Sequence, residues 1–220
     1  MRKANVEELM RKADMELRLE GRARRLGDGV NTDYIIASTR KRDTLDEGIL
    51  KHYLLEAVDP DFAASVEPGD LLVAGRDFGC GSAMEVAVTV VLAAGIRAVL
   101  AQSFSRTYYR NAVNNGLIPV ICDTRRIEEG DLLRVRVTNA QIRVVDETRG
   151  FEIHGEPLTS IMLEILAAGG LVPYVREHGG FPSGAADAGN RAQAGDRTDA
   201  ADRAQAADQA QAADQEDPCP

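Results

Sequence analysis

Residues 96–122 read IRAVLAQSFSRTYYRNAVNNGLIPVIC, and this stretch decides the fold. The apolar run 96–104 predicts a strand, and the run 117–122 predicts a second strand. The polar stretch 105–116 between them predicts a helix that ends at a glycine, residue 116. A strand, a helix and a strand in succession are typical of parallel strands joined by a crossover helix. The stretch therefore predicts an α/β domain with helices packed on a parallel sheet.

The same alternation continues toward the N-terminus. Residues 69–75 (GDLLVAG) predict a buried strand, and residues 82–94 predict a helix that is apolar nearly all round and therefore buried. Residues 22–38 predict a strand, a glycine turn and a second short apolar segment. Residues 43–58 have helical periodicity. The apolar positions of that periodicity are Leu45, Ile49, Tyr53 and Leu54.

The pattern changes after residue 130. Residues 131–155 alternate apolar and polar side chains, with turn residues at Asn139 and Gly150, which predicts an antiparallel meander. Residues 158–170 predict a closing helix. The whole pattern predicts a single three-layer mixed α/β domain with an attached β meander.

Both ends of the chain differ from this central domain. Residues 1–20 are expected to form a helical extension, because Val6, Leu9, Met10 and Met15 or Leu17 share one side of a helix over 4–19. Residues 179–220 are rich in Ala, Gln and Asp and predict a disordered tail. The central domain is therefore expected to span residues 21–178.

Composition excludes several classes of protein. The formal charge is −9, of which residues 179–220, with eight acidic and three basic side chains, carry −5. An acidic balance argues against a nucleic-acid partner. No apolar run approaches the roughly 20 residues that span a bilayer, and the charged N-terminus is unlike a signal peptide. We expect a soluble, cytoplasmic protein without a membrane partner.

The cysteines and histidines do not predict a metal site in this chain. Cys80, Cys122 and Cys219 are odd in number and widely spaced, which fits neither a disulfide framework nor a Cys-x-x-Cys site. The histidines are also scattered, without a zinc motif. Cys80 is interpreted as a small buried residue, with a redox-sensitive thiol as the alternative.

The turn Gly79-Cys80-Gly81-Ser82 joins a predicted strand to a predicted helix. Glycines at 79 and 81 allow the backbone to approach a ligand, and a helix N-terminus favours an anion. Ser82 and Glu85 also fit a capping box, which would explain both residues without a ligand. A phosphate-binding P-loop is excluded, because no Lys-Ser or Lys-Thr pair follows the glycines.

Three blocks in order carry a resemblance to a known family. GDGVNTDYII (27–36), FGCGSAMEVAV (78–88) and AGIRAVLAQSFSRTYYRNAVNNGLIPV (94–120) are similar to the small subunit of 3-isopropylmalate dehydratase, itself similar to the swivelling domain of aconitase. The resemblance implies a three-layer swivelling β/β/α domain with a mixed sheet. It also implies a hydro-lyase that isomerises 2-isopropylmalate to 3-isopropylmalate, in leucine biosynthesis, by dehydration and rehydration.

The resemblance further implies that the active site is completed by a partner. The expected partner is a large subunit that carries a [4Fe-4S] cluster on three cysteines, so that this chain holds no cofactor of its own. Alternatives remain open: a related subunit that acts on another hydroxy acid, of the homoaconitase or alkylmalate dehydratase type, or a non-catalytic regulatory paralogue. An independent anion-binding domain is a further alternative.

The resemblance assigns roles residue by residue. Ser82 matches the serine base that removes the proton next to a carboxylate, and Asp33 matches an active-site aspartate. From spacing alone, Asp33 is equally explained as a cap of the turn after Asn31 and Thr32. Other residues match family positions that shape the site indirectly. These residues are Gly79, Cys80, Arg106, Arg110 and Asn111.

The chain departs from the family directly after Ser82. The family has Ser-Ser-Arg-Glu-His where this chain has Ser82-Ala83-Met84-Glu85-Val86, so a serine and a substrate-binding arginine are missing. Either the substrate is more apolar beside Gly81, Ala83 and Met84, since methionine lines apolar pockets, or the cation comes from elsewhere. Arg42, in the basic loop STRKRD (38–43), is the candidate, although such a loop is often merely solvated.

Overall fold

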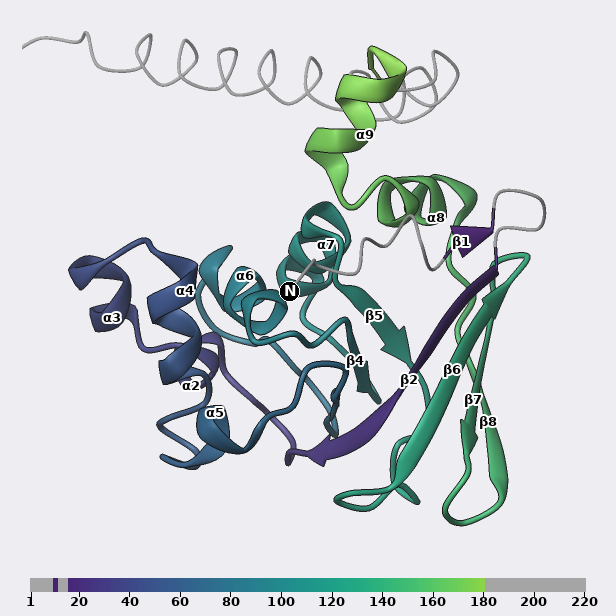
Figure 1. Ribbon diagram of the computed structural model, residues 1–220, viewed down its shortest axis with the longest axis horizontal. Helices are drawn as coiled ribbons and strands as arrows, with labels where there is room; N and C mark the ends of the chain where they lie inside the picture. Colours follow the sequence, from purple (N-terminus) through teal and green to yellow (C-terminus); the bar gives the residue numbers. More distant parts are fainter. Residues whose placement is uncertain (1–9, 12–15, 181–220) are drawn as a thin grey trace, which may run out of the picture. The chain divides into compact units, whose positions relative to one another are not determined.

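A computed structural model of the protein describes residues 10–11 and 16–180. The chain divides into two compact units, residues 1–174 and 175–220. The first unit is built on one mixed sheet (Figure 1). Its order is β5 (Ile118–Ile121), β4 (Ala98–Ala101), β3 (Leu71–Val73), β2 (Glu16–Arg25), β6 (Leu132–Thr138), β7 (Gln141–Asp146) and β8 (Phe151–Gly155), and β1 (Met10–Arg11) also pairs with β2.

The long strand β2 joins two different halves of this sheet. Its first part pairs with β6 in antiparallel register, with Leu17 opposite Val137. Its last part pairs with β3 in parallel register, with Ala23 opposite Leu71. Gly21 lies near the end of the first part, where a Cβ atom would stand 1.9 Å from the carbonyl oxygen of Gly69. The sequence change after residue 130 thus corresponds to the change from parallel to antiparallel pairing.

The parallel half confirms the prediction from residues 96–122. Strands β3, β4 and β5 are parallel and are connected by α6 (Val86–Ala93) and α7 (Arg106–Asn115). Helix α7 ends at Gly116, which has φ +81° and adopts the left-handed conformation expected of a C-terminal glycine.

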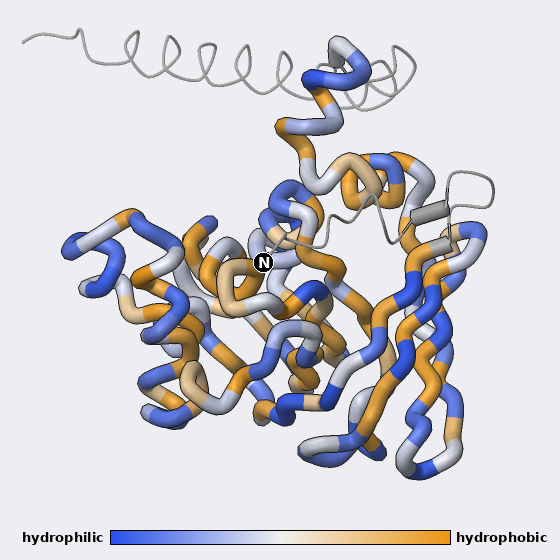
Figure 2. Tube along the Cα trace, viewed as in Figure 1, coloured by the Kyte–Doolittle hydropathy of each residue, from blue (hydrophilic) through white to orange (hydrophobic). Residues whose placement is uncertain are grey.

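The antiparallel half confirms the predicted meander. Strands β6, β7 and β8 pair in sequence order, with positive φ at the turn residues Asn139 and Gly150. Buried and exposed residues alternate along β6 and β7, and Figure 2 shows the same alternation of hydropathy. The Glu156 N–H donates to the Ile121 carbonyl at 2.8 Å, so the chain after β8 meets the end of β5 and the sheet is curled.

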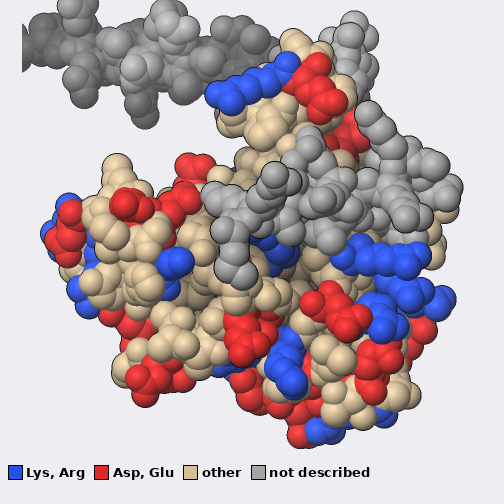
Figure 3. All heavy atoms as spheres, in the orientation of Figure 1, with Lys and Arg blue, Asp and Glu red and all other residues tan. Residues whose placement is uncertain are grey.

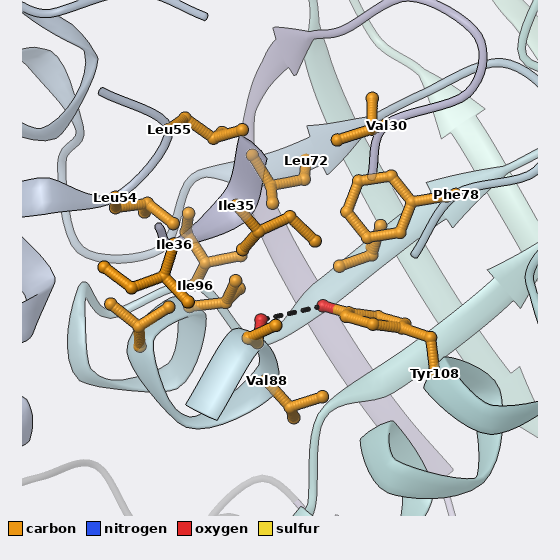
Figure 4. Close-up of a cluster of buried hydrophobic side chains, with 14 of the residues drawn as sticks. Val30, Ile35, Ile36, Leu54, Leu55, Leu72, Phe78, Val88, Ile96 and Tyr108 are labelled. Atoms are coloured by element: carbon orange, nitrogen blue, oxygen red, sulfur yellow. Dashed lines mark hydrogen bonds between the residues drawn. The ribbon is translucent and has the colours of Figure 1, made fainter. Parts of the chain in front are cut away.

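The core lies on both faces of the parallel strands. Leu72 and Val99 belong to the cluster beneath the helices, which Figure 4 shows in part. Their neighbours Leu71 and Leu100 are equally buried, and successive strand residues face opposite sides. The parallel strands are therefore a middle layer between helices and antiparallel strands, which confirms the three-layer mixed α/β class.

Short helices occupy the connection between β2 and β3. They are α2 (Thr32–Ile35), α3 (Ser38–Asp43), α4 (Glu47–Leu50), the 3-10 helix η1 (Lys51–Tyr53) and α5 (Phe62–Ser65). The prediction of one helix with a buried face over 43–58 is wrong. Leu45 is 75% exposed and Ile49 is 48% exposed, whereas Leu50 and Leu55 are fully buried. The helical turns end at Leu54, which has ψ 120°, and Leu55 then takes a positive φ of 57°.

The two ends differ from the predictions in different ways. The predicted helix α8 is present as Ser160–Ala167, and α9 (Leu171–His178) follows it. The helix expected over 4–19 is wrong where the structure describes it, because Met10–Arg11 and residues 16–19 are strand. Apolar Leu17 and Leu19 alternate with charged residues, a period-two pattern that fits a strand. The predicted boundary at residue 20 falls inside β2, and the predicted disordered tail lies outside the described residues except for its first two.

None of the helices within residues 10–11 and 16–180 combines the length and apolar character needed to cross a bilayer.

Candidate active site

The loops that carry the predicted site residues begin at the carboxyl ends of three neighbouring strands. Residues 26–36 follow β2, residues 74–85 follow β3, and residues 102–108 follow β4. Because these strands are parallel, their carboxyl ends lie at one edge of the sheet. Ligands of open α/β sheets bind at this edge, so the topology brings the three motif blocks to one place.

Backbone hydrogen bonds tie the first loop to the glycine turn. The Gly79 N–H donates to the Val30 carbonyl at 2.8 Å, and the Thr32 N–H donates to the Cys80 carbonyl at 2.8 Å. The buried Thr32 side chain adds a third link, because its hydroxyl donates to the Ser82 carbonyl at 2.9 Å. These bonds hold the backbone of Ser82 against the start of α2.

The glycines of the turn are required by both conformation and space. Gly79 has φ +74° and Gly81 has φ +98°, a region that side chains with a Cβ atom rarely adopt. A Cβ atom at Gly79 would lie 2.2 Å from Cγ of Tyr108. At Gly81 it would lie 2.3 Å from Oδ1 of Asn31. The backbone of the turn therefore packs directly on both neighbouring loops.

Ser82 is exposed, and its hydroxyl makes no hydrogen bond with any residue that the structure describes. The capping-box interpretation is wrong, because α6 begins at Val86 with Glu85 at the N-cap, where no side-chain cap bond forms. The predicted start of that helix at Ser82 is also wrong, since residues 81–84 are bend and coil. The hydroxyl is thus available for chemistry, without a structural partner of its own.

Asp33 lies in the first turn of α2 and is half-buried. Asn31 is the cap of this helix, because its Oδ1 accepts the Asp33 N–H at 2.9 Å. The Asp33 carboxylate is therefore not needed as a cap.

The third loop, residues 102–108, packs against the glycine turn 79–82 through residues that the sequence analysis did not single out. The Ser105 hydroxyl donates to the Gly79 carbonyl at 2.6 Å and also caps α7, accepting the Tyr108 N–H at 3.2 Å. The Phe78 and Tyr108 rings meet edge to face, with centroids 5.0 Å apart. Figure 4 shows the Tyr108 hydroxyl bonded to the Ala87 carbonyl in the core. Burial raises the pKa of Tyr108 and keeps its hydroxyl neutral.

The other predicted residues of this loop lie on α7. Arg106 and Arg110 are exposed, and Asn111 is half-buried with its carbonyl bonded to the Asn115 amide at 2.9 Å. Ser105 was detectable in principle, because a serine before a helical stretch is a typical N-cap.

Met84 does not line an open pocket. Its side chain is only 7% exposed and belongs to the hydrophobic core, so the expectation of a methionine-lined substrate site is corrected. The reason is its position two residues before α6, whose buried face continues through Ala87 and Val88. Ala83, in contrast, is exposed beside Ser82.

The predicted basic loop 38–43 is the helix α3. Arg40 is fixed there by ion pairs to Glu56, at 2.9 Å for each nitrogen, and by stacking over the Tyr53 ring at 3.9 Å. Hydrogen bonding to Glu56 raises the pKa of Arg40. Arg42 is exposed and makes no ion pair or hydrogen bond within the part of the chain that the structure describes. Of these two arginines, only Arg42 remains available for a ligand.

The cysteines of the described residues do not form a metal site. Cys80 is half-buried, not buried as expected, and its thiol contacts the Gly29 carbonyl at 3.5 Å. Cys122 is buried, and burial together with the nearby charge of Asp123 raises the pKa of its thiol to about 12. Groups of three or more potential metal ligands do not occur within residues 10–11 and 16–180. These residues therefore do not fit an iron–sulfur cluster.

Comparisons with known proteins agree with this geometry. The family model of the aconitase C-terminal domain matches residues 11–125, which include all three loops. The chain belongs to the aconitase C-terminal domain family. Within that family it is 42% identical to 3-isopropylmalate dehydratase small subunit 2 of Archaeoglobus fulgidus, over 74% of this chain and 98% of the relative.

Two further relatives come from Methanocaldococcus jannaschii. The methanogen homoaconitase small subunit is 41% identical, over 72% of this chain and 92% of the relative. A crystal structure of 3-isopropylmalate dehydratase superposes with a TM-score of 0.68 at 41% identity, covering 74% of this chain and 96% of that chain. The aconitase C-terminal domain fold implied by the three motif blocks is thus confirmed.

Proposed function

We propose that the chain is the small subunit of a two-subunit hydro-lyase that isomerises 2-isopropylmalate to 3-isopropylmalate. The names of its relatives support this activity. The observation that carries it is the exposed Ser82 hydroxyl, which has no partner within the described residues. Thr32 holds the backbone carbonyl of Ser82 at the carboxyl edge of the parallel strands. A serine in this position has no structural task that the fold requires.

Ser82 acts in this proposal as the base. Its ionised oxygen takes the proton from the carbon next to a carboxylate. The hydroxyl on the neighbouring carbon takes a proton from an acidic group of the completed site and leaves as water. Addition of water to the double bond in the opposite sense then gives the isomer. A serine hydroxyl is a very weak base, so it needs a dry site with hydrogen-bond donors and cations.

The exposure of Ser82 implies that a partner completes the site. An alkoxide at an exposed position would be stabilised by water alone, whereas closing the site strengthens each electrostatic interaction inside it. We propose that a large subunit covers Ser82 and Asp33 and supplies the [4Fe-4S] cluster, because the described residues of this chain do not fit one. Asp33 contributes a carboxylate to the same interface.

Arg42 is the proposed source of the missing substrate cation. The family arginine is replaced by Met84, which is buried and cannot take its place. Arg40 is held by Glu56, so Arg42 is the arginine of α3 that is free to pair with a substrate carboxylate. Arginine binds carboxylates through two parallel hydrogen bonds.

A second candidate activity is that of a homoaconitase small subunit. A relative of that name is 41% identical, nearly as similar as the dehydratase subunits. The change to Ala83 and Met84 directly after Ser82 also allows a different substrate. The two activities differ in the substrate and share the same base.

The test is anaerobic turnover of the chain reconstituted with its large subunit, followed by alkene absorbance. We expect turnover of 2-isopropylmalate and 3-isopropylmalate, and loss of at least about 100-fold in Ser82→Ala. Ser160→Ala, an exposed serine at the start of α8, is the matched control and should keep full activity.

Activity on homocitrate instead of isopropylmalate would support the second candidate. Full activity of Ser82→Ala would overturn the assignment of the base. A correctly assembled complex with no turnover of any hydroxy acid would overturn the enzymatic proposal and favour a non-catalytic subunit.

A further inference from the structure

A row of basic residues crosses the outer face of the antiparallel half of the sheet. The strand registers place Arg18 opposite Arg136, Arg136 opposite Arg143, and Arg143 opposite His154. The four residues lie on β2, β6, β7 and β8, one on each strand. Figure 3 shows Lys and Arg side chains at the right edge of the molecule, over these strands.

Such a row is unfavourable unless something pairs with it. Like charges directly opposite each other on neighbouring strands destabilise a sheet. Arg134, two residues before Arg136 on the same face of β6, shows the usual solution: it pairs with Glu20 at 3.1 Å and with Glu147 at 2.6 Å. Arg136, which faces two other arginines of the row, has no such carboxylate among the described residues.

Arg136 is the least satisfied member of the row. Its Nε atom is buried without a hydrogen-bond partner, and its guanidinium forms no ion pair within the part of the chain that the structure describes. Buried donors are nearly always paired, and an unpaired one costs free energy. Arg143 and His154 share one carboxylate, Glu152, at 3.0 and 3.2 Å. Two basic side chains of the row therefore share one acceptor, and Arg136 has none among the described residues.

A cavity of about 500 Å³ opens at this row. Its volume lies within the usual range for small-molecule sites, about 300–1,000 Å³. Arg136, Arg143 and His154 line it together with side chains that carry hydroxyl or amide donors. These are Thr138, Asn139 and Gln141. Asp and Glu are absent from the described lining residues.

We propose that this cavity is a binding site for a small oxyanion with at least two negative groups. Neighbouring strands are about 4.8 Å apart, so Arg136 and Arg143 can each take one anionic group of the same ligand. Guanidinium groups bind phosphate and carboxylate oxygens with two parallel hydrogen bonds. The ligand supplies the acceptor that Arg136 lacks and relieves the repulsion along the row. The site is separate from Ser82 and does not rest on the proposed function.

Calorimetric titration of the full chain with inorganic pyrophosphate tests the proposal. We expect saturable binding that weakens about tenfold or more in Arg136→Gln, because a charge-assisted hydrogen bond is lost. Arg136→Lys should retain part of the affinity. A parallel titration with tricarballylate distinguishes phosphate from carboxylate as the preferred anionic group.

Two variants serve as matched controls. Arg134→Gln removes a charge from the same face of β6, but one already paired with Glu20 and Glu147, and should bind pyrophosphate like the unchanged chain. Ser82→Ala should also bind normally, which separates this site from the proposed active site.

Thermal unfolding adds a readout that a structural role for Arg136 would not give. Without ligand, Arg136→Gln should melt at the same temperature as the unchanged chain or higher, because one like charge has left the row. Each of three results would overturn the proposal. They are a titration of the unchanged chain that does not saturate, an Arg136→Gln variant that binds pyrophosphate with unaltered affinity, and an Arg134→Gln variant that loses as much affinity as Arg136→Gln.

Discussion

The hydroxyl of Thr32 donates a hydrogen bond to the carbonyl oxygen of Ser82 at 2.9 Å, across 50 positions of sequence. Thr32 is 2% exposed, so the bond lies at the buried side of a loop whose other side presents the Ser82 side chain. The proposed base is thus positioned through its backbone, and its hydroxyl stays available.

Thr32→Val should separate positioning from folding. The change keeps the shape of the side chain and removes the donor, so we expect the free energy of unfolding to fall by about 1 kcal/mol. We expect kcat of the reconstituted complex to fall about tenfold or more, because small displacements of a reacting group reduce rate strongly. Thr32→Ser, which restores the hydroxyl, should recover most of kcat. A loss of stability with unchanged kcat would contradict the positioning role.

Gly79→Ala should destabilise the domain more than an alanine at another left-handed glycine. The new Cβ atom would collide with Tyr108 at 2.2 Å, in addition to the strain of φ +74°. We expect a loss of about 2 kcal/mol or more in chemical unfolding. Gly130→Ala is the control, because Gly130 has φ +81° but open space around its Cβ position. Equal losses in the two variants would show that packing against Tyr108 is unimportant.

Substitutions of Arg40 and Arg42, the two arginines of α3, should affect stability and catalysis differently. Arg40→Gln breaks the pair with Glu56 and the stacking on Tyr53, and should lower stability with little change in kcat/KM of the complex. Arg42→Gln should leave the melting temperature unchanged and lower kcat/KM about 10- to 100-fold, if a substrate carboxylate loses its two hydrogen bonds. Steady-state kinetics and thermal unfolding of both variants decide this, and normal kinetics of Arg42→Gln would remove Arg42 from the site.

A pair of buried carboxylates should make stability depend on pH. Burial raises the pKa of Asp146 above its ordinary value of 3.8, and the nearby charge of Asp131 raises it further. Burial acts in the same direction on Asp131, but hydrogen bonds from the Glu128 N–H and Arg149 outweigh it and lower the pKa of Asp131. The folded protein therefore favours a protonated Asp146 beside an ionised Asp131.

The pKa shifts of Asp146 and Asp131 change the stability of the fold in opposite directions as pH rises. Asp146 loses stabilisation as pH rises from 3.8 through its raised pKa, because the folded state there binds more protons than the unfolded state. Asp131 stabilises the fold above 3.8, and this contribution disappears as pH falls through its lowered pKa.

Chemical unfolding between about pH 2 and pH 8 checks these signs, since the Asp131 contribution is lost below pH 3.8 and the Asp146 contribution above it. Asp146→Asn mimics the protonated acid, so its stability relative to the unchanged chain should increase with pH. Asp131→Asn should destabilise by about 1–3 kcal/mol at neutral pH and by less in acid, because it removes the partner of Arg149. Parallel pH profiles for all three proteins would contradict the pairing.

Local sequence patterns determined most of the fold. The strand, helix and strand of residues 96–122, the period-two meander and the glycine at the end of α7 all depend on neighbours in the chain. Patterns of this kind were misleading where two periods competed. Residues 16–19 fit a helix and a strand about equally, and pairing with β6 made them a strand.

The candidate site was predictable only in its parts. Motif blocks in sequence order identified Ser82, Asp33 and the glycine turn, because each block is local. Three other features depend on contacts between distant segments. They are the open side of Ser82, the support that Ser105 gives to the turn, and the burial of Met84. The capping box was a reasonable local prediction, but Ser82 is bonded through its carbonyl to Thr32 and α6 starts four residues later.

The sequence by itself determined the order of strands and helices from β3 to α8, and with it the edge of the sheet where the site lies. Only the tertiary structure decided which charges are paired. Arg40 is held by Glu56 and Arg42 is exposed, although both lie on α3, and Arg134 is paired while Arg136 on the same strand is not. The physical reason is distance: an ion pair needs atoms within about 4 Å, and residues far apart in sequence reach that distance only through the folded backbone.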